Sequence, residues 1–100
     1  MSVIVIGRFK ADPADLEKVF IDHSAELQGI SDDARSKGAI HHQFVAGDGE
    51  VLIVDEWDTA KNFQSFFEGQ TQIPEILKSA NVQGPPEFEI HEVMDSPDRF

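Results

Sequence analysis

Two short apolar runs constrain the fold of this chain more than any other feature of its sequence. Val3–Ile6 reads VIVI and Val51–Val54 reads VLIV. Successive side chains of a strand point to opposite faces of a sheet, so a strand that is apolar at every position is buried on both faces. Each run is four residues long, which is too short to cross a membrane. The two runs therefore predict two central strands of one sheet that is covered on both sides.

The segment after the first run is predicted to form a long helix. Asp12 can cap its first turn, and Pro13 is tolerated at the first helical position. Apolar residues then recur at three- and four-residue steps as far as Ala34, which is typical of one face of a helix. Gly29 lies inside this helix at a cost of about 1 kcal/mol relative to alanine, so we expect a bend or break near Ser31–Asp32.

Three further segments complete the set of elements. Asp58 can cap a short helix that Gly69 interrupts, and Ile73–Ala80 continues as a second helical piece. Ala39–Ala46 and Glu87–Met94 alternate between apolar and polar residues, which is typical of strands with one exposed face. These two strands are therefore expected at the edges of the sheet.

The order of the elements is βαββαβ. Gly47–Glu50 is predicted to form a hairpin turn between the second and third strands, with Asp-Gly as its central signal. This order is typical of a ferredoxin-like α+β domain, whose four-stranded antiparallel sheet has the first and third strands in its centre. We expect residues 1–100 to form one such domain, with residues 95–100 as a tail.

The predicted sheet has more apolar surface than its helices can cover. Two helical segments can cover one face of a four-stranded sheet, whereas both central strands are apolar on both faces. An uncovered apolar face of that size is unusual for a monomer. A second copy of the same surface around a two-fold axis is the simplest partner, so we expect a homodimeric α+β barrel that pairs through the sheet.

The composition of the chain excludes several classes of partner. The formal net charge is −11. Nucleic acid and anionic membranes bind surfaces with clustered lysine and arginine, so we expect neither as a partner. The sequence has no cysteine, which excludes disulfides and thiolate metal sites and suits the cytoplasm. The first residues lack the features of a secretory signal. No helix carries two histidines at metal-binding spacing, so we expect neither a metal nor a cofactor.

The third strand and the helix after it resemble the antibiotic biosynthesis monooxygenase family, within the dimeric α+β barrel superfamily. That family typically has a strand ending in Glu-Trp, here Glu56-Trp57, then a Ser/Thr cap, here Thr59, then Phe-x-x-Phe on a helix, here Phe63 and Phe66. The resemblance extends over roughly residues 2–94. The haem-degrading branch of the family also uses an Asn on the first strand and a His on the helix after the third strand. This chain lacks both, which argues against that reaction.

Three residues are candidates for catalysis. His23 lies on the apolar side of the first predicted helix and His42 on the more apolar side of the second strand, so both can serve one pocket between helix and sheet. A neutral imidazole there can act as a general base. Asp55 shares a strand face with Trp57 and can act as a base if it is buried, whereas His41 points away from His42. The alternative is that both histidines are packing residues with satisfied hydrogen bonds.

Four aromatic residues are candidates for lining a ligand pocket. Trp57 is the only tryptophan, and its N–H can orient a bound oxygen atom. The other three candidates are Phe44, Phe63 and Phe67. Core packing is the alternative for all four, because large aromatic side chains dominate the burial of apolar area.

The resemblance implies a cofactor-independent monooxygenase acting on a small aromatic or polyketide-like substrate in an apolar pocket between sheet and helices. His23, His42 or Asp55 would remove a proton, and the resulting anion would donate electrons to O2. The alternative is a non-catalytic module that binds a small apolar molecule or a partner. A third hypothesis is haem binding without degradation, with His42 or His23 as the axial ligand.

Overall fold

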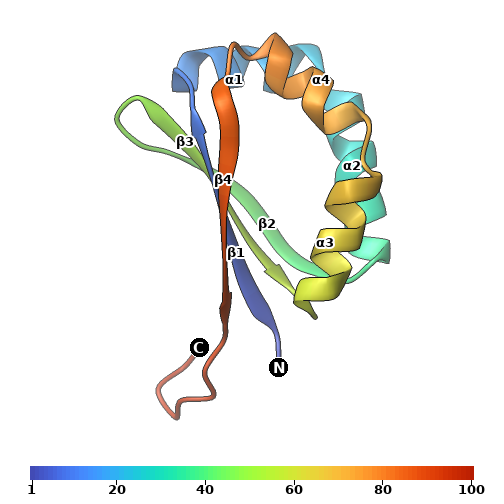
Figure 1. Cartoon of the computed structure of the whole chain (residues 1–100), viewed down its shortest axis with the longest axis vertical. Coiled ribbons are helices and arrows are strands. Elements are labelled where there is room, and N and C mark those ends of the chain that lie inside the picture. Colours follow the sequence, from blue (N-terminus) through green and yellow to red (C-terminus); the bar gives the residue numbers. More distant parts are fainter.

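The computed structural model describes residues 1–100 and consists of one antiparallel sheet with helices on one of its faces (Figure 1). The strands are β1 (Val3–Lys10), β2 (Ala39–Ala46), β3 (Glu50–Trp57) and β4 (Gln83–Glu92). The helices are α1 (Pro13–Asp22), α2 (Ser24–Ser36), α3 (Ala60–Gly69) and α4 (Gln72–Ser79). The architecture is the ferredoxin-like α+β fold that the sequence predicts, with each helical segment divided in two.

The order of strands in the sheet is β2-β3-β1-β4, so the two apolar runs form the centre as predicted. Val5 pairs with Asp55 and Ile6 with Val54 across the two central strands. Val5 faces the helices and is almost fully buried, whereas its neighbour Ile6 points to the opposite face and is half-buried. The two strands that are apolar on both faces thus lie in the centre of the sheet, where apolar residues are needed on both faces.

The break in the first helical segment lies at His23 and not near Ser31–Asp32, so the predicted position was wrong. His23 has φ −119° and ψ 28°, which ends α1 and starts α2. The reason is the curvature of the helical layer, which arches over the twisted sheet (Figure 1). Leu16 and Val19 on α1 pack at one end of the sheet and Ala34 on α2 packs at the other, so the chain turns between them. Gly29 is exposed and is tolerated inside α2.

The second helical segment begins one residue later than predicted. The Thr59 hydroxyl, not the Asp58 carboxylate, caps α3 by accepting a hydrogen bond from the Asn62 N–H at 3.1 Å. Asp58 instead accepts from the Thr59 N–H at 2.7 Å and lies against Gly38. Gly38 follows α2 with φ +123°, and a Cβ there would collide with the Asp58 carboxylate. Glycine is therefore required at this turn, where it ends the helical segment.

The last strand is longer at its start than predicted and shorter at its end. β4 begins at Gln83 and includes Pro85 and Pro86, then ends at Glu92 instead of Met94. Proline cannot donate to a strand ladder, but an edge strand has one side without a partner and tolerates it. The position of β4 at the edge of the sheet therefore explains how both prolines fit.

The core between sheet and helices has two parts. The first, near the hairpin end of β3, is aliphatic and consists of Ala11, Leu16, Val19, Val51, Ile76 and Ala80. The second, near the other end of β3, is mainly aromatic and consists of Val3, Val5, Trp57, Phe63 and Phe66. Only the second part borders a large apolar cavity.

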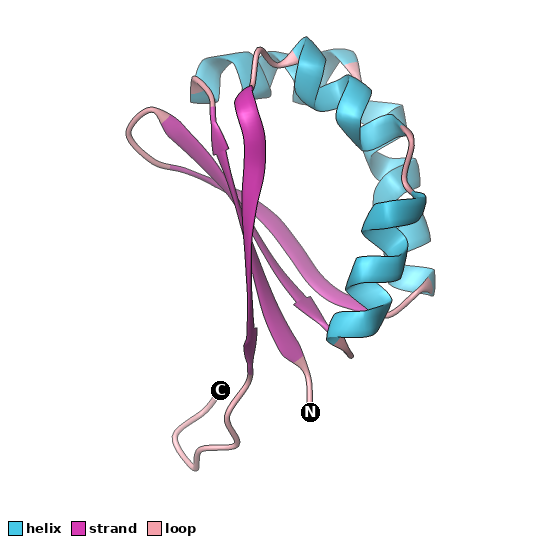
Figure 2. Ribbon diagram, in the orientation of Figure 1, coloured by secondary structure: helices cyan, strands magenta, loops and turns pink.

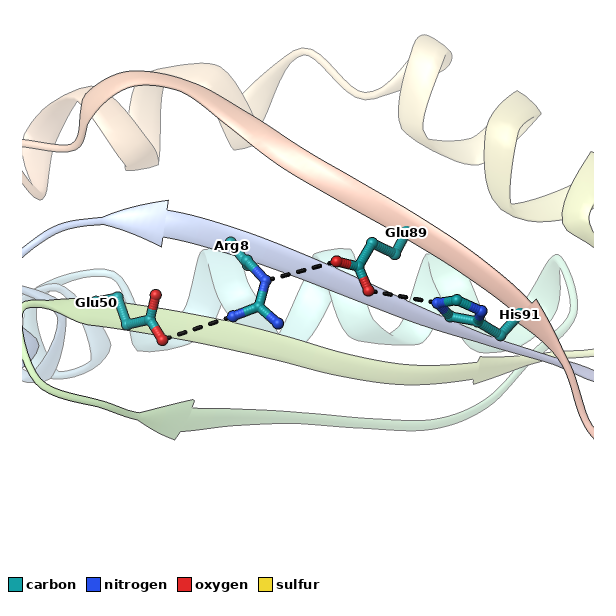
Figure 3. A network of polar contacts seen from close by, with 4 residues as sticks. All are labelled: Arg8, Glu50, Glu89 and His91. Atoms are coloured by element: carbon teal, nitrogen blue, oxygen red, sulfur yellow. Dashed lines mark hydrogen bonds and ion pairs between the residues drawn. The ribbon is translucent and has the colours of Figure 1, made fainter.

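The opposite face of the sheet carries no helix (Figure 2). Its centre is apolar, and each of its four central side chains is half-buried: Ile4, Ile6, Leu52 and Val54. On the same face Arg8 lies 3.6 Å from Glu50 and 3.7 Å from Glu89, and His91 lies 3.3 Å from Glu89 (Figure 3). None of the four helices has the length and apolar character needed to cross a bilayer.

Candidate functional site

A cavity of about 260 Å³ lies between the helices and the second part of the core. Of its 18 lining residues, 13 are hydrophobic. Small-molecule sites are concave and mostly apolar with a few placed polar groups, typically about 300–1,000 Å³ in volume. The composition of this cavity fits that description, and its size suits a small aromatic ring system.

One wall of the cavity is aromatic and comes from α3 and β4. Phe88 on β4 contacts two rings of α3: its ring centroid lies 4.8 Å from that of Phe67 and 5.7 Å from that of Phe63. Phe66 completes this wall and packs on the Trp57 indole at 5.3 Å. These rings offer flat apolar surfaces to a ligand, at separations typical of favourable aromatic pairs.

The opposite wall carries the polar groups and comes from α2, β2 and β3. Ser31 and Arg35 lie one turn apart on α2, so their side chains share a face of the helix. His42 on β2 and Asp55 on β3 line the cavity beside them. The cavity therefore has an aromatic side and a polar side.

His42 and Asp55 form a hydrogen-bonded pair at the polar wall. The sheet register places the two residues directly opposite each other, and His42 Nδ1 lies 2.6 Å from Asp55 Oδ1. The Trp57 Nε1–H donates to the other carboxylate oxygen at 3.2 Å. The Asp55 side chain is only 11% exposed, whereas that of His42 is 40% exposed. Both oxygens of the Asp55 carboxylate thus have a hydrogen-bond partner within the chain. The more exposed His42 imidazole lies on the solvent side of that carboxylate.

This arrangement defines which nitrogen of His42 can act as a base. An ionised carboxylate only accepts hydrogen bonds, so in the neutral imidazole the proton lies on Nδ1, between His42 and Asp55. The lone pair then lies on Nε2, the ring nitrogen away from Asp55. A carboxylate that holds a histidine in one tautomer and stabilises its protonated form is the arrangement that serves general-base catalysis.

The structure brings together two of the three predicted catalytic residues. His42 and Asp55 meet at the cavity, but His23 does not line it, so the predicted common pocket for the two histidines was wrong. His23 lies at the junction of α1 and α2, where its Nδ1 is 3.1 Å from Glu26 Oε1. Because α1 ends at His23, the helical spacing from which its direction was predicted is interrupted at this residue.

Three of the four predicted aromatic lining residues are in place. Trp57, Phe63 and Phe67 line the cavity, and Trp57 is fully buried. Phe44 does not line it: its ring packs against Phe20 on α1, with centroids 4.9 Å apart. Phe44 instead packs against the aliphatic part of the core.

The sequence prediction missed several lining residues. Phe88 completes the aromatic wall, and Ser31 and Arg35 form the rim on α2. The four-residue spacing of Ser31 and Arg35, beside the apolar stripe of α2, was the available signal. His41 pairs across from Glu56 on the outer face, yet it also borders the cavity, where the register of β2 shifts between Ala39 and His41.

The fold and this cavity together define a class of structure. The chain has the fold of the antibiotic biosynthesis monooxygenases, as two solved structures described by that name show at 17% and 18% identity. The resemblance seen in the sequence is therefore confirmed at the level of the fold. No model of a known protein family matches the chain, and no curated protein matches its sequence.

Three similar structures illustrate the range of this fold. SnoaB from Streptomyces nogalater, a cofactor-independent oxygenase, has a TM-score of 0.64 at 14% identity, with 98% of each chain covered. The monooxygenase ActVA-Orf6 of Streptomyces coelicolor, solved with nanaomycin D, has a TM-score of 0.68 at 16% identity, with 95% of this chain and 89% of that chain covered. NE2512 from Nitrosomonas europaea, of unknown function, has a TM-score of 0.65 at 17% identity, with 99% and 95% covered.

Proposed function

We propose that this protein is a cofactor-independent monooxygenase that acts on a small aromatic or polyketide-like substrate with an acidic C–H group. The observation that carries the proposal is the His42–Asp55 pair at the polar wall of an otherwise apolar cavity. The similar fold of SnoaB, a cofactor-independent oxygenase, supports it. So does the ligand of ActVA-Orf6, nanaomycin D.

In the proposed reaction, His42 Nε2 removes a proton from a methylene carbon of the substrate, and Asp55 stabilises the imidazolium that forms. The carbanion transfers an electron to O2, and the two resulting radicals combine into a C–O bond. The imidazolium returns its proton to the peroxide anion. Loss of water from this hydroperoxide leaves a ketone, so that one methylene group and one O2 become one carbonyl group and one water. The substrate supplies all the electrons, and the protein supplies orientation, a dry cavity and proton transfer.

Oxygen uptake with anthrone as the probe tests this proposal. Anthrone has an acidic methylene group between two aromatic rings, and its oxidation to anthraquinone follows the stoichiometry above. We expect catalysed uptake by the wild type and a loss of about 100- to 10,000-fold in turnover for His42→Ala, the usual contribution of a general base. His23→Ala is the matched control and should keep full turnover, because His23 does not line the cavity. Equal turnover in His42→Ala and the wild type would contradict the assignment.

A non-catalytic binding module is the second function that the cavity supports, because its aromatic wall can hold an apolar ligand without any chemistry. Binding of anthrone without catalysed oxygen uptake would favour this function. Haem binding stays a prediction for His42, whose Nε2 makes no hydrogen bond within the chain; His23 does not line the cavity. A Soret band that appears with hemin and is absent in His42→Ala would support it.

We further propose that the chain forms a homodimer through the helix-free face of the sheet. The support is the apolar centre of that face, where Ile6 pairs with Val54 between two central strands. A second copy around a two-fold axis would cover both surfaces at once. Light scattering should give twice the chain mass for the wild type and one chain mass for Ile6→Glu. Ile21→Glu, at an exposed apolar position on α1, is the control and should stay dimeric. A monomeric wild type would contradict the proposal.

The cytoplasmic location stays a prediction.

A further inference from the structure

We propose that Arg35 and Ser31 form an anion-binding subsite at the rim of the cavity, and that the ligand is therefore an aromatic compound carrying a carboxylate or another acidic group. This inference deepens the proposed function, because it concerns the same cavity, and it rests on that function for its relevance to turnover.

Arg35 is the only lysine or arginine among the 18 residues that line the cavity. It is exposed, and it forms none of the ion pairs in the structure, so no carboxylate lies within 4.0 Å of its guanidinium. The nearest acidic residues along α2 do not neutralise it: Asp33 pairs with Lys37 at 3.0 Å, and Asp32 makes no ion pair. In a chain of net charge −11, a cation at a ligand cavity is thus left without a protein partner.

Asp55 is the one carboxylate that lines the cavity, and it does not compete for Arg35. Its two oxygens already accept from His42 and Trp57, at 2.6 Å and 3.2 Å. The guanidinium is therefore available to an acidic group that enters from solvent. A guanidinium can bind a carboxylate or sulfonate through two parallel hydrogen bonds, which makes arginine well suited to this role.

Ser31 and Arg35 also lie on the correct side of the cavity for a common ligand with His42. α2 packs against β2, which carries His42, so hydroxyl, guanidinium and imidazole groups come from adjacent elements. Phe67 and Phe88 lie on the other wall, from α3 and β4. A ligand with its rings on the phenylalanines and its acidic group at Arg35 would lie across the cavity, beside the His42 imidazole. An aromatic ligand without an acidic group would leave the polar rim unused.

Two fluorescent probes with the same ring system separate the contribution of the anion. 8-Anilino-1-naphthalenesulfonate carries a sulfonate, and N-phenyl-1-naphthylamine lacks it. We expect the wild type to bind the sulfonate probe more tightly, and Arg35→Gln to weaken its binding about tenfold while changing the neutral probe less than about twofold. Arg99→Gln, in the tail, removes the same charge and should change neither affinity. The indole N–H signal of Trp57, the only tryptophan, should shift with each probe, because this side chain lines the cavity.

Three results would overturn the inference. Arg35→Gln could weaken the binding of both probes equally, it could weaken the binding of neither, or neither probe could shift the indole signal. The measurement is independent of turnover and of oxygen. His42→Ala should retain the preference for the sulfonate probe even though it is expected to lose oxygen uptake. A protein that binds the sulfonate probe through Arg35 but never consumes oxygen would thus refute the monooxygenase and leave the anion subsite standing.

Discussion

The two ends of the layer between helices and sheet share one fold but hold different side chains. Around Leu16 and Val51 the fully buried side chains are aliphatic, and they pack without a large apolar cavity. Around Trp57 and Phe63 they are aromatic and enclose a cavity, and only this end contains a buried carboxylate, Asp55. A buried charge needs dedicated partners, which Asp55 has in His42 and Trp57. One end therefore stabilises the domain, and the other carries the cavity in which the proposed binding and reaction would take place.

Leu16→Ala should have the largest effect and should act on stability alone. Leu16 is 3% exposed at the aliphatic end, so truncation leaves a cavity and lowers the free energy of unfolding by about 3 kcal/mol. Oxygen uptake per folded molecule should not change. Denaturant unfolding measures the first quantity and the oxygen electrode the second. Lys18→Ala, at an exposed position of the same helix, is the control. A large loss of turnover in the folded Leu16→Ala protein would contradict the assignment of stability to one end of the core and of turnover to the other.

Asp55→Asn should act on turnover more than on the fold. The asparagine carbonyl can accept from the Trp57 N–H, which turns its NH2 group toward His42 Nδ1. The imidazole must then carry its proton on Nε2, so the base is lost from the outward-facing nitrogen. We expect turnover to fall about 100-fold while the far-UV circular dichroism spectrum stays that of the wild type. Wild-type turnover in this variant would show that Asp55 does not orient the base.

Phe67→Leu should have the smallest effect and should act on affinity. Phe67 is half-buried in the aromatic wall, and its replacement keeps the apolar character while removing the flat ring surface. Binding of N-phenyl-1-naphthylamine should weaken about threefold, since an aromatic pair contributes roughly 0.5–1.5 kcal/mol beyond its area. Phe44→Leu, outside the cavity, is the matched control and should leave the affinity unchanged. An equal effect of both substitutions would mean that the probe does not lie on this wall.

The sequence predicts the strands better than the helices because the strand signal is local. The runs Val3–Ile6 and Val51–Val54 identify the central strands without further information. The turn at His23 depends on how the helical layer follows the twisted sheet, which no local pattern reports. Asp58 and Thr59 are both good caps, and only the position of Gly38 against Asp58 decides between them.

The candidate site was predictable in part. Counting back from the turn Gly47–Glu50 pairs Ala46 with Val51, and the same count places His42 opposite Asp55. The position of the turn and the strand periodicity were therefore enough to predict the His42–Asp55 pair. The role proposed for Arg35 could not be predicted from the sequence, because it depends on which side of α2 faces the edge of the sheet beside His42.

The protonation state of the His42 ring tests the central claim most directly. A long-range ¹H–¹⁵N spectrum of the imidazoles, recorded above the pH at which histidine is protonated, distinguishes the two neutral tautomers, and the His42 signals are assigned by their absence in His42→Gln. The Asp55 hydrogen bond predicts a proton on Nδ1 and a bare Nε2, and Asp55→Asn should reverse the two. A wild-type spectrum with the proton on Nε2 would contradict the claim that this pair presents a base to the cavity.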